Sequence, residues 1–578
     1  MRNDLMETVA RKMFRRARRL AQAPLGASAT LFGLGVLAFG SPAAPARADS
    51  PDGPVVRAPA GAVKGVRNGD IDIFRAIPYA LPPTGARRWR PPAPMPVWDG
   101  IRPARKVGPA CIQPPMAPGP YRRDFAASSE DCLILDVTAP AHAHNAPVMV
   151  WIHGGTLIWG SSQSPSYDGK QFARRGVVLV SINYRLGVLG YLAHPDLSKE
   201  SADGISGNYG LLDQIAALRW VRRNIGAFGG DARNVTVFGE SAGALSVEYL
   251  LAAPPARGLF DKAIVESGYQ FTMPALRDTR YGEQSAEAIG TQLAAKLGAK
   301  DIAALRSMDP HHVTDAAQAA GYAPYGTIDG KILTRQLVDT FDRGEQAPVP
   351  LLAGFNSGEV RGLRVLLPPL PASDAAYAAT IKARYGDLAE AYLTLYPPRD
   401  PDQARLDAAR DTIFGWSAER LVRKQATLGQ PSFLYFFSHD YPAARSAALT
   451  AFHAGEVPFV FGTLTSTPAA WPKIPDTAEE HGLSRAMIDY WTSFARNGRP
   501  TATDAPAWPP FAEGHAYMRL AAAPQAARDF MPGMYALHEQ AMCRRRQAGT
   551  QSWDWKSGAL APVLPQPVPA CPGLPTDP

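Results

Sequence analysis

Residues 234–251 contain the feature that most restricts the fold of this chain, a glycine-flanked turn between a strand-like run and a helix-like run. Asn234 to Phe238 is rich in β-branched and aromatic residues, and Ala242 to Leu251 has the composition of a helix. Between them lies Gly239-Glu240-Ser241-Ala242-Gly243. Small residues on both sides of a serine suit a sharp turn in which the backbone approaches closely. The segment therefore predicts a strand-turn-helix unit that exposes Ser241 at one edge of a sheet.

Strand-like and helix-like segments alternate along most of the chain, which favours an α/β fold with a largely parallel central sheet covered by helices. An amphipathic helix is predicted over 210–226, where apolar residues recur at helical spacing. Residues 364–430 are mostly helical in pattern and predict an insertion that covers the substrate. Short apolar runs predict further strands at 148–152, 177–182, 262–266, 349–354 and 432–437.

The first 48 residues have the organisation of an export signal. Four arginines within 15–19 form a basic region, an apolar stretch covers 25–40, and Ala46-Arg47-Ala48 supplies a small-x-small cleavage pattern. We therefore expect cleavage after Ala48 and a secreted or periplasmic protein without a stable membrane span. A retained anchor is the alternative, although the stretch is short for a span of about 20 apolar residues. The choice between general and twin-arginine export stays open.

The charge of the chain is concentrated in this leader. Eight basic and two acidic residues in the first 48 account for +6 of the formal net charge of +8, which leaves +2 for the remainder. The remainder has no basic run interleaved with aromatic residues, so nucleic-acid binding is not expected. No Cys/His cluster has zinc-like spacing either, and we expect neither a metal nor another cofactor.

All four cysteines lie beyond the leader, at Cys111, Cys132, Cys543 and Cys571. An even number in an exported chain favours two disulfides, with free buried thiols as the alternative. Three pairings are possible, and Cys111–Cys132 with Cys543–Cys571 closes the two shortest loops. We expect one large domain over 49–540 and a proline-rich extension over 541–578 that a disulfide could staple.

A second glycine-rich segment, His153-Gly154-Gly155-Thr156, directly follows the predicted strand that ends at Ile152. Such a loop can aim backbone N–H groups at an oxyanion that forms when a serine attacks a carbonyl. The amide of Ala242, directly after the serine, is a further donor. Both segments together indicate nucleophilic chemistry at a carbonyl carbon.

These motifs, with others, give the chain a resemblance to the type-B carboxylesterase and cholinesterase family from about Gly61 to Leu520. The other matching segments are Phe74 to Ala80 with Pro82-Pro83, Glu130 to Val137, Trp220-Val221, Asn224-Ile225 and Phe228 to Asp231. The resemblance implies the α/β-hydrolase fold with helical insertions over the active site, and a Cys111–Cys132 disulfide. It also implies a serine esterase that cleaves carboxylic esters to acid and alcohol through an acyl-enzyme.

The resemblance further implies a Ser-His-Glu triad. Glu359 is the last residue of the segment Gly354 to Glu359, which is similar to the acid motif of the family. His453 lies in the segment Ala451 to Glu456, which is similar to the histidine loop of the family. Glu240 and Ser267 would not react themselves but would help to hold the triad residues in position. Spacing alone leaves His439 and His481 as other bases, and Asp329 and Glu345 as other acids.

Two residues near the expected pocket depart from the family pattern. Thr156 stands where Gly or Ala is usual, yet its amide can still donate, so Gly155, Thr156 and Ala242 are the predicted oxyanion donors. The β-branched side chain of Thr156 is stiffer than an unbranched one, and it either narrows the active site or adds a hydroxyl group to it. Trp159 is either an aromatic wall for the substrate or a packed core residue.

The same triad could serve an amidase, a carbamate hydrolase or a transacylase, and related chains that lost the nucleophile are adhesion proteins. The intact Ser241, Glu359 and His453 favour catalysis on a small-molecule ester. Since His453 must be neutral to act as a base, we expect activity to decline as pH falls through about 6–7. The sequence identifies neither the physiological ester nor the oligomeric state.

Overall fold

The computed structural model describes residues 53–125, 127–553, 556–571 and 574. The predicted leader, 1–48, lies outside these residues. Among the helices of the described part, none combines the length and apolarity that crossing a bilayer requires.

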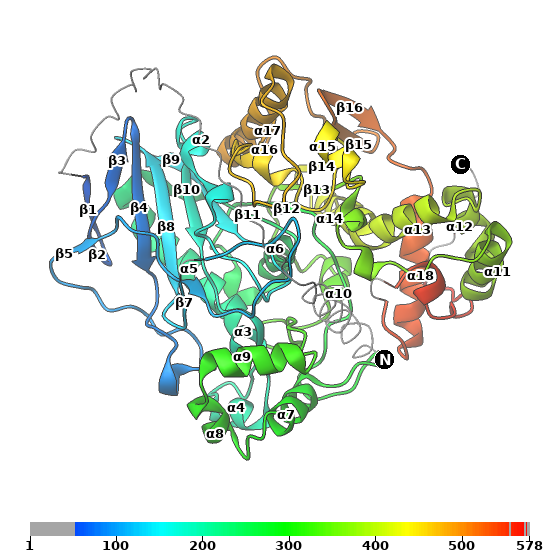
Figure 1. The fold of residues 1–578 in the computed structure, drawn as a ribbon, viewed down its shortest axis with the longest axis horizontal. Coiled ribbons are helices and arrows are strands. Elements are labelled where there is room, and N and C mark those ends of the chain that lie inside the picture. Colours follow the sequence, from blue (N-terminus) through cyan, green and yellow to red (C-terminus); the bar gives the residue numbers. More distant parts are fainter. Residues whose placement is uncertain (1–52, 126, 554–555, 572–573, 575–578) are drawn as a thin grey trace, which may run out of the picture.

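A twisted sheet of 11 strands runs through the molecule, in the order β16-β15-β14-β13-β12-β11-β9-β10-β8-β4-β3 (Figure 1). Its centre is parallel, which confirms the predicted architecture, and consists of β10 (Val178–Ile182), β9 (Ala146–Ile152), β11 (Gly230–Glu240), β12 (Lys262–Glu266), β13 (Leu351–Asn356), β14 (Ser432–Phe437) and β15 (Ala516–Leu520). Antiparallel strands complete both edges: β8 (Ile134–Pro140), β4 (Ile71–Pro78) and β3 (Val66–Asn68) at one, and β16 (Pro524–Arg528) at the other.

Both faces of the sheet are buried under helices, as the continuous apolar runs predict. All seven residues of β9 are buried. Val148, Val150 and Ile152 belong to one core cluster, while Met149 and Trp151 belong to another on the opposite face. The first face carries α5 (Tyr209–Asn224), α6 (Ala242–Ala252) and α14 (Trp416–Ala426), and the second carries α2 (Lys170–Ala173), α16 (Val457–Phe461) and α17 (Ala478–Asn497).

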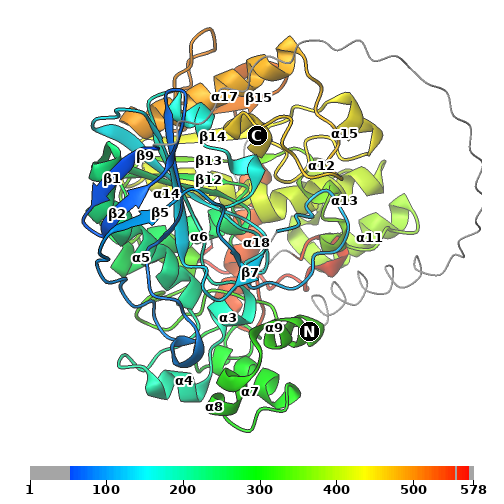
Figure 2. The same ribbon diagram turned by 60° about the vertical axis from the view of Figure 1, so that its left-hand side comes forward.

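The predicted helical insertion between β13 and β14 is present. It contains α11 (Asp374–Tyr385), α12 (Ala389–Leu395) and α13 (Pro401–Arg410) before α14 returns to the sheet. Figures 1 and 2 show α11 to α13 gathered beside the sheet, next to the C-terminal helix α18 (Met534–Ala548). These helices share a small core of their own, in which Tyr385, Tyr392 and Tyr396 are fully buried.

Helix α18 crosses the predicted domain boundary at residue 540, so the first residues of the C-terminal extension belong to this helix. Both predicted disulfides are present: the S–S distance is 2.04 Å for Cys111–Cys132 and 2.10 Å for Cys543–Cys571. The amide of Leu564 also donates to the carbonyl of Arg384 at 2.8 Å, so the extension is fastened to the helical insertion.

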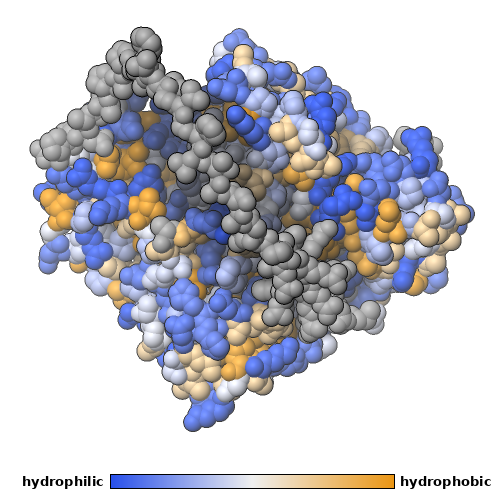
Figure 3. Space-filling model, viewed as in Figure 1, coloured by the Kyte–Doolittle hydropathy of each residue, from blue (hydrophilic) through white to orange (hydrophobic). Residues whose placement is uncertain are grey.

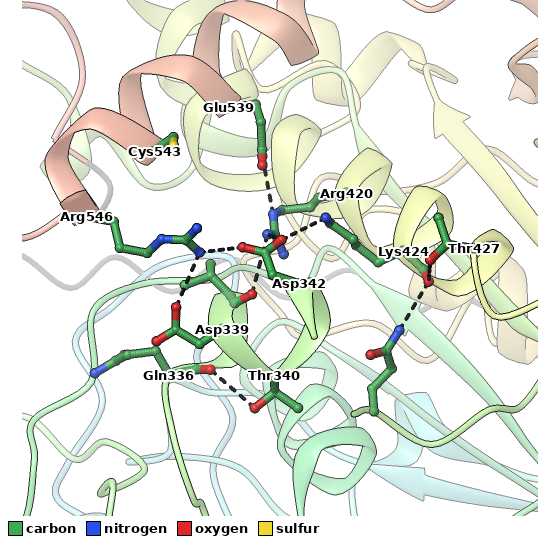
Figure 4. Close-up of polar contacts among 12 residues, drawn as sticks. Gln336, Asp339, Thr340, Asp342, Arg420, Lys424, Thr427, Glu539, Cys543 and Arg546 are labelled. Carbon is green, nitrogen blue, oxygen red and sulfur yellow. Dashed lines mark hydrogen bonds and ion pairs between the residues drawn. The ribbon is translucent and has the colours of Figure 1, made fainter. Parts of the chain in front are cut away.

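A network of ion pairs joins α18 to the rest of the molecule (Figure 4). Asp342, at the end of α10 (Leu337–Asp342), accepts from Arg420, from Lys424 at 2.7 Å and from Arg546 on α18. The guanidinium of Arg420 has no exposed surface and also meets Glu539 at 3.2 Å. One aspartate thus links three helices that are far apart in the sequence.

Most of the molecular face seen in Figure 3 is hydrophilic, with small hydrophobic areas scattered over it. Large apolar side chains with high exposure are few among the described residues, and they are Val55, Val97, Ile101, Val107, Leu370 and Val563. The apolar residues of the chain are therefore used mainly to build the core.

Candidate active site

Ser241 occupies a strained turn between β11 and α6. Its backbone angles are φ 57° and ψ −121°, a conformation that costs energy for a residue with a Cβ. The flanking glycines explain how the turn fits: a Cβ on Gly243 would lie 2.0 Å from the carbonyl oxygen of Ile152, and one on Gly239 would lie 2.6 Å from it. The predicted strand-turn-helix unit is confirmed, but Ser241 is only 5% exposed rather than open at the edge of the sheet.

Glu359 and His453 meet behind this turn. Nδ1 of His453 lies 2.5 Å from Oε2 of Glu359, and both side chains are buried. Glu359 follows β13, while His453 precedes α16. The two loops are held together by a hydrogen bond from the Gly358 amide to the Ala451 carbonyl at 2.8 Å and by a β-bridge between Gly358 and Phe452.

The second carboxylate oxygen of Glu359 is held by two donors. The Ser267 hydroxyl donates to Oε1 at 2.6 Å, and the Asn356 amide donates to it at 2.7 Å. Glu359 has no exposed surface. Because Oε1 is fixed in this way, Oε2 is directed at the imidazole. Ser267, which was predicted to support the triad, is thus in direct contact with Glu359.

The other imidazole nitrogen faces Glu240. Nε2 of His453 lies 3.1 Å from Oε1 of Glu240, and within the described chain Ser241 donates no hydrogen bond to the imidazole. Burial opposes a charged imidazole, but Glu240 and Glu359 outweigh it and raise the pKa of His453 to about 9. Burial in turn raises the pKa of Glu240 to about 7, despite the opposing charge of His453.

The glycine-rich loop after β9 lies against Ser241. A Cβ on Gly154 would be 3.1 Å from the Cβ of Ser241. Gly155 (φ 108°) and Thr156 (φ 55°) have left-handed backbones, and their amides have no hydrogen-bond acceptor among the described residues. Ala242 is the first residue of α6, where the amides have no partner within the helix. The three predicted donors are therefore available to an oxyanion.

Two further buried glutamates, Glu266 and Glu456, lie behind Glu240. Glu266 accepts from the indole N–H of Trp491 at 2.8 Å. Burial raises the pKa of Glu266 to about 8 and the pKa of Glu456 well above its usual value. Neither residue was predicted as part of the site, although Glu456 is three residues after His453 and Glu266 directly precedes Ser267.

Aromatic rings that were not predicted from the sequence surround His453. Tyr121 presents its ring edge to the imidazole with centroids 6.3 Å apart, and Phe414 packs on it at 5.3 Å. Tyr269 contacts Phe414 at 6.1 Å. Trp159 is half-buried, and its indole N–H donates to the Pro114 carbonyl at 2.9 Å, so its ring is fixed in place.

The other candidate acids and bases lie in contacts of their own. His439 is buried against Glu480 at 2.7 Å, and His481 meets Asp476 at the surface at 2.6 Å. Asp329 accepts from three successive backbone amides, and Glu345 pairs with Arg335. None of these contacts includes Ser241 or its neighbours. Within the described part of the chain, no group of three or more His, Cys, Asp or Glu side chains is arranged to hold a metal ion.

Known proteins resemble this chain over most of its length. A model of the carboxylesterase family matches residues 52–536. The fumonisin B1 esterase of Sphingopyxis macrogoltabida is 38% identical, covering 82% of this chain and 87% of its own. The para-nitrobenzyl esterase of Bacillus subtilis is 35% identical, covering 78% and 91%.

A solved structure of a PNB esterase superimposes with a TM-score of 0.72 at 33% identity, covering 85% of this chain and 98% of its own. A carboxylesterase from Geobacillus stearothermophilus gives a TM-score of 0.70 at 33% identity, covering 84% and 99%. These matches confirm the α/β-hydrolase fold and the family resemblance. The chain belongs to the carboxylesterase family and is a carboxylic-ester hydrolase.

Proposed function

We propose that the protein is an exported serine carboxylesterase in which Ser241 attacks the ester carbonyl and forms an acyl-enzyme. The observation that carries this proposal is the strained backbone of Ser241, which stands at the turn beside a His453–Glu359 pair. Strain of this kind persists where the surrounding structure requires it, as at active sites.

Each step of the proposed reaction has a residue to perform it. His453 takes the Ser241 proton as Oγ bonds to the carbonyl carbon, and Glu359 stabilises the imidazolium that results. The amides of Gly155, Thr156 and Ala242 donate to the oxyanion. When the tetrahedral intermediate collapses, the C–O bond to the alcohol breaks and His453 returns the proton to the alkoxide. Water, activated by the same histidine, then releases the acid and regenerates Ser241.

Ser241→Ala and phosphonate labelling test this assignment. Purified protein should hydrolyse a 4-nitrobenzyl ester of a short acid, and Ser241→Ala should lower kcat by at least about 10³-fold, because the remaining oxyanion donors give only residual catalysis. A fluorophosphonate should modify the wild-type protein on the peptide that contains Ser241. As a matched control, Ser484→Ala removes a buried hydroxyl that donates to the Phe459 carbonyl and should leave turnover unchanged. Near-wild-type turnover by Ser241→Ala would overturn the assignment of the nucleophile.

The export part of the proposal is supported by the two disulfides, which form and persist in oxidising compartments. We expect the mature protein to begin at Asp49, after removal of residues 1–48. N-terminal sequencing of protein from the culture medium or the periplasm tests this directly. A chain that keeps its first 48 residues in the membrane fraction would instead support the retained anchor.

A further inference from the structure

Arg123 lies in the disulfide-closed loop between Cys111 and Cys132, close to the candidate active site. Tyr121, two residues earlier, packs its ring edge against the imidazole of His453. The guanidinium of Arg123 lies over the ring of Tyr167, 5.3 Å from its centroid. The same loop segment therefore reaches both the predicted base and the chain that follows the oxyanion loop.

The guanidinium is held entirely by neutral groups. Its Nη1 donates to the hydroxyls of Ser164 and Ser166, each at 2.9 Å, and no carboxylate of the described residues forms an ion pair with it. Ser166 is itself fixed, since its hydroxyl also bonds to the Ser466 carbonyl at 3.0 Å. The cation is thus oriented without being neutralised.

This arrangement differs from that of most fully buried arginines among the described residues. Five of these six pair with carboxylates, in Arg88–Glu130, Arg185–Asp213, Arg410–Asp411, Arg420–Asp342 and Arg544–Asp387, and the sixth is Arg545. A guanidinium fixed in place with free donors is suited to bind a planar carboxylate through two hydrogen bonds. Arg123 is half-buried, so part of the residue remains exposed to solvent.

The charge of Arg123 also acts on the residues around Ser241. Burial lowers the pKa of His153, the first residue of the oxyanion loop, to about 4, and Arg123 adds to that decrease. Burial raises the pKa of Glu240, and Arg123 is among the charges that oppose the rise. Arg123 therefore lies within electrostatic range of both segments that flank the nucleophile.

Resting on the proposed function, we propose that Arg123 selects ester substrates that carry a second, ionised carboxylate, which it binds while Ser241 attacks the ester. The preferred substrates are half-esters of dicarboxylic acids or esters of carboxylate-bearing alcohols. In either class, an anion in the substrate supplies the partner that the protein itself does not provide. The carboxylate contributes to binding, so its effect appears chiefly in KM.

Three esters of similar size test this proposal and identify which part of the substrate carries the charge. They are 4-nitrobenzyl hexanoate, which is neutral, the mono-4-nitrobenzyl ester of hexanedioic acid, which is charged on the acyl side, and 4-carboxybenzyl hexanoate, which is charged on the alcohol side. The quantity compared is kcat/KM for each charged ester divided by kcat/KM for the neutral ester. In Arg123→Gln this ratio should fall at least tenfold for one of the charged esters, mainly through KM.

Arg122→Gln is the matched control, because Arg122 is exposed and its one ion-pair partner among the described residues is exposed Asp124, at 3.1 Å. It should change the ratio less than twofold. A ratio that Arg123→Gln leaves unchanged, or equal losses on all three esters, would show that Arg123 merely balances the buried glutamates, and would overturn the proposal.

A measurement on the wild-type protein alone keeps the test valid if Arg123→Gln does not fold. Raising NaCl from about 0.02 M to about 0.5 M should lower the ratio severalfold, because added salt screens the attraction between guanidinium and carboxylate. A ratio independent of salt would count against the proposal. If the wild-type protein hydrolyses none of the esters, the proposed esterase function fails instead. If hydrolysis depends on Ser241 but the ratio does not change in Arg123→Gln, the specificity proposal fails while the proposed esterase function stands.

Discussion

Nε2 of His453 lies 3.1 Å from a carboxylate oxygen of Glu240, the residue directly before the proposed nucleophile. With Glu359 on its other side, the imidazole is placed between two carboxylates, and these raise its pKa to about 9 against the effect of burial. A base works in its neutral form, so activity should be lost as pH falls through this raised value. This places the decline at higher pH than the 6–7 expected from an ordinary histidine.

Glu240→Gln should move the acidic limb of the kcat/KM profile to lower pH. The substitution removes one negative charge that favours the imidazolium, so the pKa of His453 falls and the neutral base persists to lower pH. Measuring kcat/KM from pH 5 to pH 10 on a neutral ester gives the shift. Glu266→Gln is the control, since Glu266 bonds to Trp491 and makes no contact with His453. Equal shifts in both variants would contradict a direct effect of Glu240.

Ser267→Ala should lower kcat about tenfold or more while KM changes little. The hydroxyl donates to Glu359 at 2.6 Å, and a hydrogen bond to a charged group contributes roughly 1.5–3 kcal/mol. Without it, only the Asn356 amide fixes that oxygen, so Glu359 orients the imidazole less well. Steady-state kinetics on a neutral ester measure the effect. A change confined to KM would argue against a role through Glu359.

Gly155→Ala and Thr156→Gly should have opposite consequences in the oxyanion loop. A Cβ on Gly155 would lie 2.2 Å from the Trp159 carbonyl oxygen, so alanine must displace the loop, and kcat should fall at least about 10²-fold. Thr156 has φ 55°, which glycine adopts without strain, and its amide remains. Thr156→Gly should therefore keep turnover within severalfold and change the free energy of unfolding by no more than about 1 kcal/mol. Comparable losses of kcat in both variants would contradict an amide donor at 156.

Asp342→Ala should destabilise the protein by about 3 kcal/mol, because it leaves the fully buried guanidinium of Arg420 with Glu539 as its remaining carboxylate partner. Asp339→Ala is the matched control on the same helix, since the one ion pair of Asp339 within the described chain is with Arg546, at 3.4 Å, and this substitution should cost less than about 1 kcal/mol. Urea unfolding at neutral pH measures both. Equal losses in the free energy of unfolding for the two variants would mean that the burial of Arg420 does not determine the size of the loss.

The sequence could predict those parts of the fold and site that depend on local pattern. The turn at Ser241 and the parallel strands follow from short apolar runs and glycine spacing. Glu359 and His453 are separated by nearly a hundred residues, so only the family resemblance identified them. The edge strands β3 and β16 were not predicted, because both are partly exposed and lack the continuous apolar run that marks a buried strand.

Residues in irregular loops were missed for a different reason. Tyr121 and Arg123 have no periodic neighbours that would reveal where their side chains lie, whereas Phe414 lies in the helical segment Asp411–Gly415, whose contact with His453 the sequence pattern does not reveal. Their positions depend on tertiary contacts, such as the Cys111–Cys132 disulfide and the packing of the helical insertion on His453. The disulfide was predicted, but it does not reveal where the side chains of its loop lie, so the substrate specificity that such loops control is hard to predict.

The pairing of β13 with β14 has a consequence for how such an enzyme can diversify. Six consecutive residue pairs, together with the bridge between Gly358 and Phe452, fix the points where the helical insertion leaves the sheet and rejoins it. Loop-closure entropy grows only slowly with length, so α11 to α13 can be lengthened, shortened or exchanged at small thermodynamic cost. These helices can therefore be replaced as a unit, in evolution or by design, and new substrates acquired, while Glu359 and His453 keep their relative positions.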